Sequence, residues 1–357
     1  MKLRVGILGA TGMVGQRFIA LLEHHPWFEV AVVAASARSA GKKYGQAVEG
    51  RWSQAGAIPA RVRDLPVAAV EHEVAAIASQ ADFVFSAIEA DKEVVARLEE
   101  EYASAGLPVV SNNSAHRWTP DVPLLMPEVN PEHTDLIGEQ QERRGWHKGF
   151  IVVKPNCSIQ CIVPLLKAWE RFTPEQVVVS TYQALSAAGK TLATWPEMRD
   201  NIIPFIGGEE EKSECELLKI LSRIEDGQFV LPKTLKISAT CIRVPVSDGH
   251  LAAISIGFKI KPTREELIAA LGEFKNPLKE LKLPSAPEPF ITYFEEANRP
   301  QTKLDRDLGR GMGVAVGRLR PDSVLDFKCV ALSHNTIRGA AGGAILAAEL
   351  LHAKGYV

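Results

Sequence analysis

The sequence predicts an α/β protein with two domains, and three observations lead to this prediction. The chain has 357 residues, which is more than one hydrophobic core usually holds. Its first part alternates short apolar runs with helical patterns, which is typical of a parallel sheet flanked by helices. After about residue 150, strand-like segments outnumber helices, which predicts a largely antiparallel sheet with helices on one face.

The composition excludes several classes of protein. Apolar content of 46% and charged content of 24% are ordinary for a soluble globular protein. A net charge of -2 predicts no binding to nucleic acid or to a membrane surface. No apolar run approaches the roughly 18 residues of a spanning helix, and the first residues read as a strand rather than a signal peptide. The 5 scattered cysteines include no C-x-x-C pair, which favours a reducing cytoplasm over disulfides or a zinc site.

A glycine-rich turn joins the first predicted strand, residues 3–8, to a helix from about Val14 to His24. Gly9 allows the tight turn, Gly12 lets the backbone approach a pyrophosphate, and Gly15 permits close packing of helix on strand. This spacing at the very first strand–helix unit predicts a Rossmann-like dinucleotide-binding domain. A glycine-rich turn without a ligand is the alternative.

The end of the second strand indicates which dinucleotide is bound. In sites that prefer NAD, an acidic residue at this strand end binds the ribose 2′-hydroxyl. The second strand is predicted at Val30–Ala35, and no acidic residue follows it directly. Ser36, Arg38, Ser39 and Lys42 follow instead, and an Arg fork suits a 2′-phosphate. We therefore predict that the cofactor is NADP. The alternative is that these residues form an exposed polar turn that does not contact the ribose.

The rest of the first domain is less informative. Residues 45–75 show no clear pattern and suggest an insertion, whereas 81–86 and 108–110 are predicted strands. Ser86 and Arg117 follow these strands, at the sheet edge where ligands collect, so they are candidates to face a cofactor or an anionic substrate. For Arg117 a solvated loop is equally consistent with the sequence. Helices are expected at 91–105 and at roughly 131–144, before a domain boundary near residue 150.

A cysteine lies where the next strand turns into a helix. Residues 150–153 read as a strand, and 159–169 read as a helix despite Pro164. Cys157 would lie near the helix N-terminus, where free N–H groups and the dipole favour a thiolate. The amide of Asn156 and the Cys157 N–H could stabilise an oxyanion. The alternative is a small buried cysteine after a strand.

The second domain is predicted to contain a broad sheet, and an apolar outer face would make this sheet a dimer surface. Asp248-Gly249 predicts a hairpin between two of its strands. A helix over 263–274 begins with a capping box, and a last helix, about 336–353, carries small residues that suit packing against the first domain. The expected strands are 177–184, 237–246, 251–260, 313–319 and 324–332.

Polar residues of this domain form candidate partners for Cys157. Arg243 and His250 flank the predicted hairpin, so paired strands could aim both at one cleft. A histidine is a natural proton shuttle for a cysteine nucleophile, and an arginine suits a substrate carboxylate. Glu209 and its neighbours open a helix at 209–224, where acids also suit the dipole. Each of these residues could instead be structural.

Together the motifs resemble one family, the aspartate-β-semialdehyde dehydrogenases of the archaeal and fungal branch, nearly end to end. The motifs that carry the resemblance are Gly9-Ala-Thr-Gly-Met-Val-Gly15, Ser36-Ala-Arg-Ser-Ala-Gly41, Ser111-Asn-Asn-Ser114, Pro155-Asn-Cys-Ser158, Ile242-Arg-Val-Pro-Val246 with His250, and His334-Asn-Thr-Ile-Arg-Gly-Ala-Ala-Gly-Gly343.

The resemblance implies NADPH-dependent reductive dephosphorylation of L-4-aspartyl phosphate to L-aspartate 4-semialdehyde, a step toward lysine, threonine and methionine. It implies an NADP-binding domain over 1–150, completed by a C-terminal helix at about 336–357 that returns to it. A catalytic and dimerisation domain over 151–335 would follow. A cytoplasmic homodimer or homotetramer is expected, with small-molecule substrates and no metal.

The resemblance also assigns roles to single residues. Cys157 is similar to the nucleophile that forms a thioacyl intermediate, and His250 to the acid/base, with Asn156 at the oxyanion and Gln183 orienting the substrate. The expected substrate-binding residues are Arg243 at the α-carboxylate, Glu209 at the α-amino group, Arg117 and Lys212 at the phosphate, and Asn113. The expected cofactor-binding residues are Gly9, Thr11, Gly12, Met13, Val14, Ser36, Arg38, Ser39, Ser86, Ser186, Gly189 and Asn335.

Two other functions remain open at this point. Malonyl-CoA reductases of the same branch reduce a CoA thioester through the same cysteine. They lack the asparagine before this cysteine and the arginine of the Arg-Val-Pro motif, which are Asn156 and Arg243 in this sequence. A catalytically silent dinucleotide-binding regulator would keep the glycine turn without needing Cys157. The segment Ser186-Ala187-Ala188-Gly189 departs from the family's usual Ser-Gly-Ala-Gly, at the loop expected to face the nicotinamide.

Overall fold

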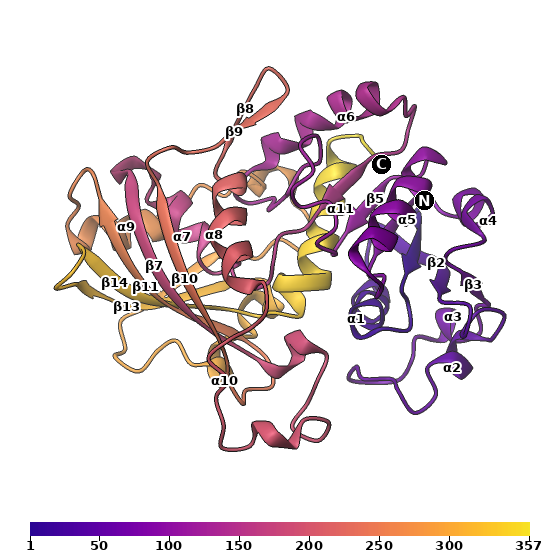
Figure 1. Ribbon diagram of the computed structural model, residues 1–357, viewed down its shortest axis with the longest axis horizontal. Coiled ribbons are helices and arrows are strands. Elements are labelled where there is room, and N and C mark those ends of the chain that lie inside the picture. The colour runs from indigo at the N-terminus through magenta and orange to yellow at the C-terminus, as the bar shows by residue number, and fades with distance from the viewer.

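The computed structural model describes residues 1–357, and it has two lobes, each built on a six-stranded sheet (Figure 1). The first sheet contains β1 (Leu3–Leu8), β2 (Phe28–Ala35), β3 (Val67–Ala69), β4 (Phe83–Ser86), β5 (Val109–Ser111) and β6 (Ile151–Val153). The second contains β7 (Pro174–Gln183), β10 (Lys236–Arg243), β11 (His250–Phe258), β12 (Ile291–Phe294), β13 (Val314–Pro321) and β14 (Phe327–Ser333). A small hairpin, β8 (Arg223–Glu225) and β9 (Gln228–Val230), projects from the second lobe.

The first sheet has the strand order β3-β2-β1-β4-β5-β6, and all its pairings are parallel. This is the order of a dinucleotide-binding fold, in which ligands bind where the order reverses, between β1 and β4. Helices pack around the sheet, so strands such as β4 and β5 are buried along their whole length. The predicted Rossmann-like fold is confirmed.

The two sheets are accompanied by the helices α1 to α11. They are α1 (Met13–Leu22), α2 (Tyr44–Ala47), α3 (Ala60–Arg63), α4 (Val74–Gln80), α5 (Lys92–Ser104), α6 (Leu136–Arg144), α7 (Val163–Ala168), α8 (Glu209–Ile220), α9 (Arg264–Gly272), α10 (Thr302–Asp305) and α11 (Gly342–Ala353). The capping box predicted at Thr263 is present at the start of α9. None of the helices is long and apolar enough to cross a lipid bilayer.

The unpatterned segment 45–75 contains regular structure after all. It holds α3 and the edge strand β3, in which Val67 pairs with Val33 of β2. The sequence did not predict β3, because a strand of 3 residues is too short for an alternation of apolar and polar residues to be recognised.

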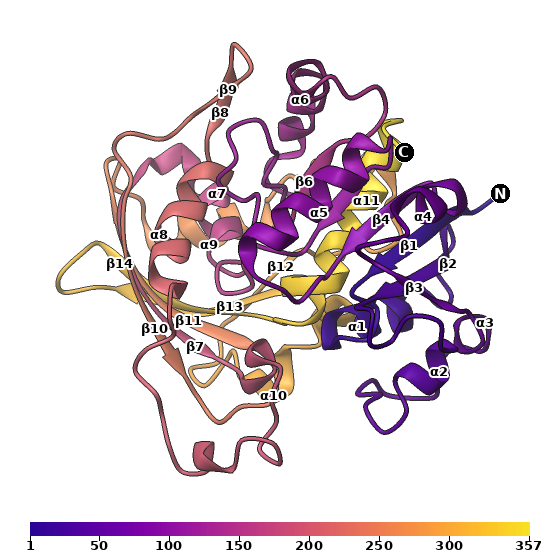
Figure 2. The same cartoon turned by 45° about the vertical axis from the view of Figure 1, so that its right-hand side comes forward.

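The C-terminal helix α11 returns to the first lobe, as predicted (Figure 2). It contacts α1 and β5, and Ile345 and Leu350 belong to the same hydrophobic core as Phe18 and Phe28. The helix begins later than expected, because residues Ile337–Ala341 form a short π-helical turn first. The exact division into domains at residue 150 stays a prediction.

The second sheet is mixed rather than purely antiparallel. Its three central pairings, β7–β11, β11–β14 and β14–β13, are antiparallel, and the outer pairings β7–β10 and β13–β12 are parallel. The predicted hairpin at Asp248-Gly249 is wrong, because β7 lies between β10 and β11. Gly249 does supply the turn conformation, with φ +97°. The dipeptide indicates a turn but cannot say which strand pairs with which.

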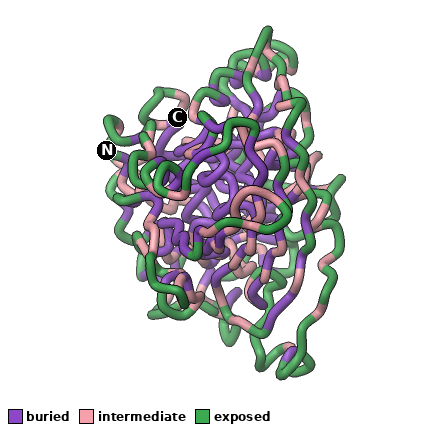
Figure 3. Tube along the Cα trace, turned by 90° about the vertical axis from the view of Figure 1, so that its left-hand side faces the viewer, coloured by how far each residue is buried: buried purple, intermediate pink, exposed green.

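Helices cover one face of this sheet, and the opposite face is partly exposed. The helix α8 contacts β10, and α9 contacts β12 and β13; Figure 2 shows α7, α8 and α9 on the same side of the sheet. Along β7 the residues Val177 and Val179 are buried, whereas Val178 between them is 51% exposed. In the molecule as a whole, the buried segments of the chain lie mainly in the middle (Figure 3).

Candidate active site

The structure brings Cys157 and His250 into contact. Cys157 lies in the turn after β6 and is half-buried, and its Sγ is 3.3 Å from Asn156 Oδ1 and 3.4 Å from His250 Nε2. His250 is the first residue of β11 and is fully buried. The sulfur therefore has one histidine and one amide as hydrogen-bond partners.

The helix after Cys157 begins later than the sequence predicts. Residues 158–162 form turns, and α7 starts only at Val163, with Pro164 in its first turn. Proline is favoured there because its missing N–H has no partner within the helix anyway. Cys157 thus lies in the turn before the helix rather than in its first turn.

The resting sulfur is a thiol rather than the expected thiolate. Burial, reinforced by the Glu209 carboxylate, raises the pKa of the Cys157 thiol to about 11, although Lys154 and Arg117 act against this. Burial, reinforced by the Arg243 charge, lowers the pKa of His250 to about 3. At neutral pH the pair is therefore an uncharged thiol beside an uncharged imidazole.

Charged groups that could hold a small amino acid surround the sulfur. Arg243, at the end of β10, donates from Nη1 to the Ala184 carbonyl at 2.7 Å. Glu209, the first residue of α8, accepts from Asn156 Nδ2 at 3.0 Å and from Lys212 Nζ at 3.0 Å. Burial alone would raise the pKa of Glu209, but the Lys212 ammonium and these hydrogen bonds outweigh it and hold that pKa below its usual value. Gln183 Nε2 reaches the same carboxylate at 3.4 Å.

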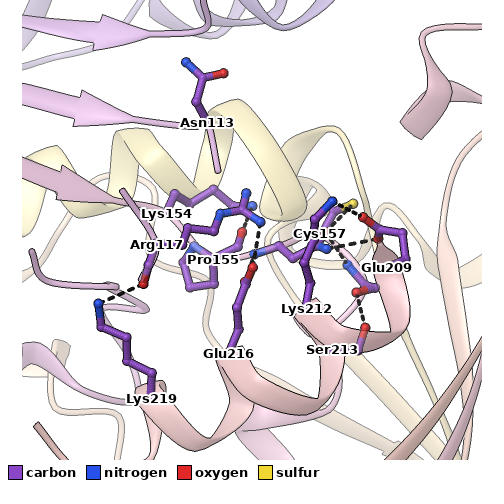
Figure 4. Close-up of polar contacts among 12 residues, drawn as sticks. Asn113, Arg117, Lys154, Pro155, Cys157, Glu209, Lys212, Ser213, Glu216 and Lys219 are labelled. Carbon is purple, nitrogen blue, oxygen red and sulfur yellow. Dashed lines mark hydrogen bonds and ion pairs between the residues drawn. The ribbon is translucent and has the colours of Figure 1, made fainter. Parts of the chain in front are cut away.

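Arg117 is buried rather than solvated. Its side chain lies in the view of Figure 4 beside Glu216, and Nη1 donates to Glu216 Oε1 at 2.9 Å. Arg117 is only 7% exposed, and its buried Nε has no hydrogen-bond partner. One donor of the guanidinium thus remains available to an anion.

Asn113 lies apart from the other labelled side chains in Figure 4. Its Nδ2 donates to Ser86 Oγ at 3.1 Å and to Glu99 Oε1 at 3.1 Å, both in the first lobe. The structure therefore does not bring Asn113 to Cys157. Asn113 lies instead beside Ser86, at the ends of β4 and β5.

Sequence reasoning missed Glu216 and Lys219. Glu216 is fully buried and also accepts the backbone N–H of Asn156 at 2.7 Å, so it joins Arg117 to the cysteine turn. Lys219 Nζ donates to the carbonyls of Arg117, Thr119 and Val122 at 2.8, 3.0 and 3.0 Å. The signal was helical periodicity. The polar residues Glu209, Lys212, Glu216 and Lys219 recur at the spacing of one helix face, and in α8 that face points inward.

Two further residues shape the turn around the sulfur. Lys154 Nζ donates to the carbonyls of Pro155 and Gly339, and burial lowers the pKa of Lys154 to about 7. A Cβ on Gly339 would lie 2.7 Å from the Cβ of Cys157, so this position must be glycine for the cysteine to fit. Neither role could be read from the sequence, because Gly339 is far from Cys157 along the chain.

The glycine turn and the second strand end enclose a cavity of about 170 Å³. Gly9 has φ +81°, and a Cβ there would collide with the carbonyl of Ala87. Predicted residues that line the cavity are Gly9, Thr11, Gly12, Ser36 and Arg38, and Ser39 is buried nearby. Arg51 and Glu89 also line it and were not predicted. These residues suit a dinucleotide, because α1 begins directly after the turn without a side-chain cap on its first N–H groups, and Arg38 offers a charge for a phosphate.

A second cavity, of about 310 Å³, lies between α1 and the segment after β7. Met13, Val14 and Ser186 line it, and Asn335 Nδ2 donates to Ser186 Oγ at 2.8 Å. Gly189 is close by, since a Cβ there would lie 3.8 Å from Met13 Sδ. These predicted cofactor residues come together from both lobes. No group of three or more His, Cys, Asp or Glu side chains is arranged to hold a metal ion.

Comparisons with known proteins agree along the whole chain. Residues 4–137 match the model of the semialdehyde dehydrogenase NAD-binding domain, and residues 162–338 match that of the semialdehyde dehydrogenase dimerisation domain. The aspartate-semialdehyde dehydrogenase of Methanothermobacter thermautotrophicus is 46% identical over 351 residues, 98% of each chain, and that of Aspergillus fumigatus is 44% identical over 365 residues, 100% of this chain and 99% of the relative. The crystal structure of the Candida albicans enzyme with NADP superposes with a TM-score of 0.88 at 42% identity, covering 100% of both chains.

Proposed function

The chain belongs to the aspartate-semialdehyde dehydrogenase family, and we propose that it catalyses the NADPH-dependent reductive dephosphorylation of L-4-aspartyl phosphate to L-aspartate 4-semialdehyde. The observation that carries this proposal is the contact between Cys157 Sγ and His250 Nε2 at 3.4 Å, with Glu209 and Arg243 beside it. The product is a precursor of lysine, threonine and methionine.

The charges around the sulfur complement the two ends of the substrate. Arg243 binds the α-carboxylate through its fork, and Glu209 binds the α-ammonium group. Lys212 and the free Nε of Arg117 bind the phosphate. Gln183, held by hydrogen bonds to Thr181 and Glu209, orients the bound amino acid. These groups place the acyl carbon against the sulfur, which lowers the entropic cost of attack.

The chemistry needs a nucleophile because a thioester accepts a hydride more readily than a carboxylate does. Cys157 displaces phosphate from the acyl carbon and forms a thioester. The Cys157 N–H and the Asn156 amide stabilise the oxyanion in this step and in the reduction that follows. His250 is the only titratable group that is hydrogen-bonded to the sulfur, so it acts as the acid/base that takes up the thiol proton.

NADP fits the residues present, and NADPH supplies the hydride when it is bound. The turn at Gly9 to Val14 holds the pyrophosphate, and Ser36, Arg38 and Ser39 hold the 2′-phosphate. Ser86 lies at the adjacent strand end. Ser186, Gly189 and Asn335 would hold the nicotinamide end of the cofactor.

The second lobe carries the family's dimerisation domain, and we propose a homodimer through the partly exposed face of the second sheet, on which Val178 lies, or a homotetramer built from two such dimers. All 5 cysteines are free, which fits a reducing cytoplasm.

The test is a steady-state assay in the reverse direction. Reduction of NADP should require aspartate semialdehyde and inorganic phosphate together. Reduction of NADP at the same rate with and without inorganic phosphate would contradict the proposal. Oxidation of NADPH with malonyl-CoA, but not with aspartyl phosphate, would instead identify a CoA-thioester reductase, and Asn156 and Arg243 favour the first outcome.

A further inference from the structure

A buried lysine holds the segment that carries Arg117. Lys219 lies on α8 and is only 3% exposed, and its Nζ donates to the backbone carbonyls of Arg117, Thr119 and Val122 at 2.8, 3.0 and 3.0 Å. Figure 4 shows the contact with the Arg117 carbonyl. An ammonium group has three hydrogens, so these carbonyls use all of its donors. Lys219 can therefore act on a substrate only through the segment that it holds.

This segment, residues 117–122, has little other support. It follows β5 and consists of turns and bends, without a strand or a helix. The carbonyls of Arg117 and Val122 accept no backbone N–H, and both residues are buried. Buried carbonyls need a hydrogen-bond partner, and the Lys219 ammonium is the partner of these two. The position of the segment relative to α8 therefore depends on Lys219.

The same face of α8 also holds the other end of Arg117. Glu216 lies three residues before Lys219, and its Oε1 accepts from Arg117 Nη1 at 2.9 Å. Two neighbouring residues of one helix thus fix both the backbone and the guanidinium of Arg117. Arg117 Nε is left without a partner, and this is the donor that the proposed function assigns to the phosphate.

The first turn of α8 carries a second cation for the same phosphate. Lys212 lies there beside Glu209, to which it donates a hydrogen bond of 3.0 Å. Arg117 comes from the first lobe, whereas Lys212 belongs to the second. Two cations can bind the oxygens of one phosphate only at a suitable separation, and here a single helix sets that separation through its contacts with Arg117.

We propose that Lys219 is a positioning residue of the phosphate site, which holds the backbone of Arg117 at the distance from Lys212 at which both cations contact one phosphate group. This inference rests on the proposed function and deepens it, because it assigns the placement of Arg117 to a residue of the other lobe. Lys219 itself does not touch the substrate.

The test is reverse-direction kinetics of Lys219→Met, with inorganic phosphate and aspartate semialdehyde varied in turn. Met keeps the apolar part of the side chain and removes its three donors. We expect the KM for phosphate to rise by about tenfold or more and the KM for aspartate semialdehyde to change by less than about twofold, because a misplaced charged donor weakens only the contact that it makes. An unchanged KM for phosphate, or an equal rise of both KM values, would overturn the inference.

A double-mutant cycle separates positioning from a general loss of structure. If Lys219 acts through Arg117, Lys219→Met should raise the KM for phosphate much less in an Arg117→Ala background than in the wild type. Additive effects would mean that Lys219 supports the protein without placing Arg117. Lys167→Met is the matched control, since Lys167 also lies on a helix, α7, and pairs with Glu170 at 2.8 Å. It should leave both KM values unchanged.

Lys219→Gln is the second variant, for the case that Lys219→Met does not fold. Its amide keeps two N–H donors, so part of the buried carbonyl group can still be satisfied, but it carries no charge and is shorter. We expect the KM for phosphate to rise by about threefold or more, again with a smaller effect in the Arg117→Ala background. A wild-type KM for phosphate in Lys219→Gln would overturn the inference as well.

The two proposals fail in different ways. Wild-type protein that reduces NADP without phosphate would refute the proposed function, and with it the role of Lys219. Wild-type protein that requires phosphate, together with a Lys219 variant that keeps the wild-type KM for phosphate, would refute only the role inferred for Lys219.

Discussion

Replacing Glu216 by glutamine should loosen the phosphate site and the cysteine turn together. Glu216 Oε1 accepts from Arg117 Nη1 at 2.9 Å, and Oε2 accepts from the Asn156 N–H at 2.7 Å. Gln keeps one oxygen and replaces the other by an NH₂ group that has no lone pair to offer. Whichever way the amide turns, it faces either the guanidinium or the backbone N–H with a second donor.

The size of the effect follows from burial. Glu216 is fully buried and Arg117 is 7% exposed, so water cannot replace the lost contact. Removing one partner of such a pair typically costs about 3–5 kcal/mol of stability. The surviving hydrogen bond places Glu216→Gln at the lower end, about 3 kcal/mol. A displacement of 1 Å at reacting groups can cost about 10² in rate, so we expect kcat to fall by about one to two orders of magnitude.

The assay is reverse-direction kinetics with inorganic phosphate as the varied substrate, together with thermal unfolding. We expect the KM for phosphate to rise, because Arg117 is no longer held, and the melting temperature to fall by several degrees. Glu211→Gln is the matched control, since Glu211 lies on the same helix but is exposed. If Glu216→Gln keeps the wild-type KM for phosphate and the wild-type kcat, Glu216 does not position Arg117.

Three other changes test separate parts of the site. Arg38→Ala should weaken NADP binding by about 10- to 100-fold, because hydrogen bonds to a charged group are worth about 1.5–3 kcal/mol; calorimetry should show little change for NAD, and equal losses would refute a 2′-phosphate role. Alkylation of Cys157 by iodoacetamide, measured in a Cys215→Ser background, should keep accelerating as pH rises toward about 11, since the raised pKa leaves a thiol at neutral pH; a plateau near pH 8 would contradict this. Gly339→Ala should lower kcat by about tenfold or more, because overpacking there costs about 1–3 kcal/mol and presses on Cys157; an unchanged kcat would show that the turn can shift freely.

The sequence predicted what short-range patterns encode. The turn at Gly9 follows a strand and opens a helix within a few residues, so its spacing alone carries the dinucleotide-binding fold. The pairing of Cys157 with His250 could be proposed from residue chemistry, since few side chains other than histidine suit a cysteine nucleophile.

What the sequence did not reveal depends on contacts between distant segments. The insertion of β7 between β10 and β11 depends on the partners of three strands, and an Asp-Gly turn contains no such information. The raised pKa of Cys157 depends on its desolvation by segments that are distant along the chain, whereas local spacing suggested a helix N-terminus that begins only at Val163. Glu216 looked like one more acid on a charged helix until its face was seen to point inward.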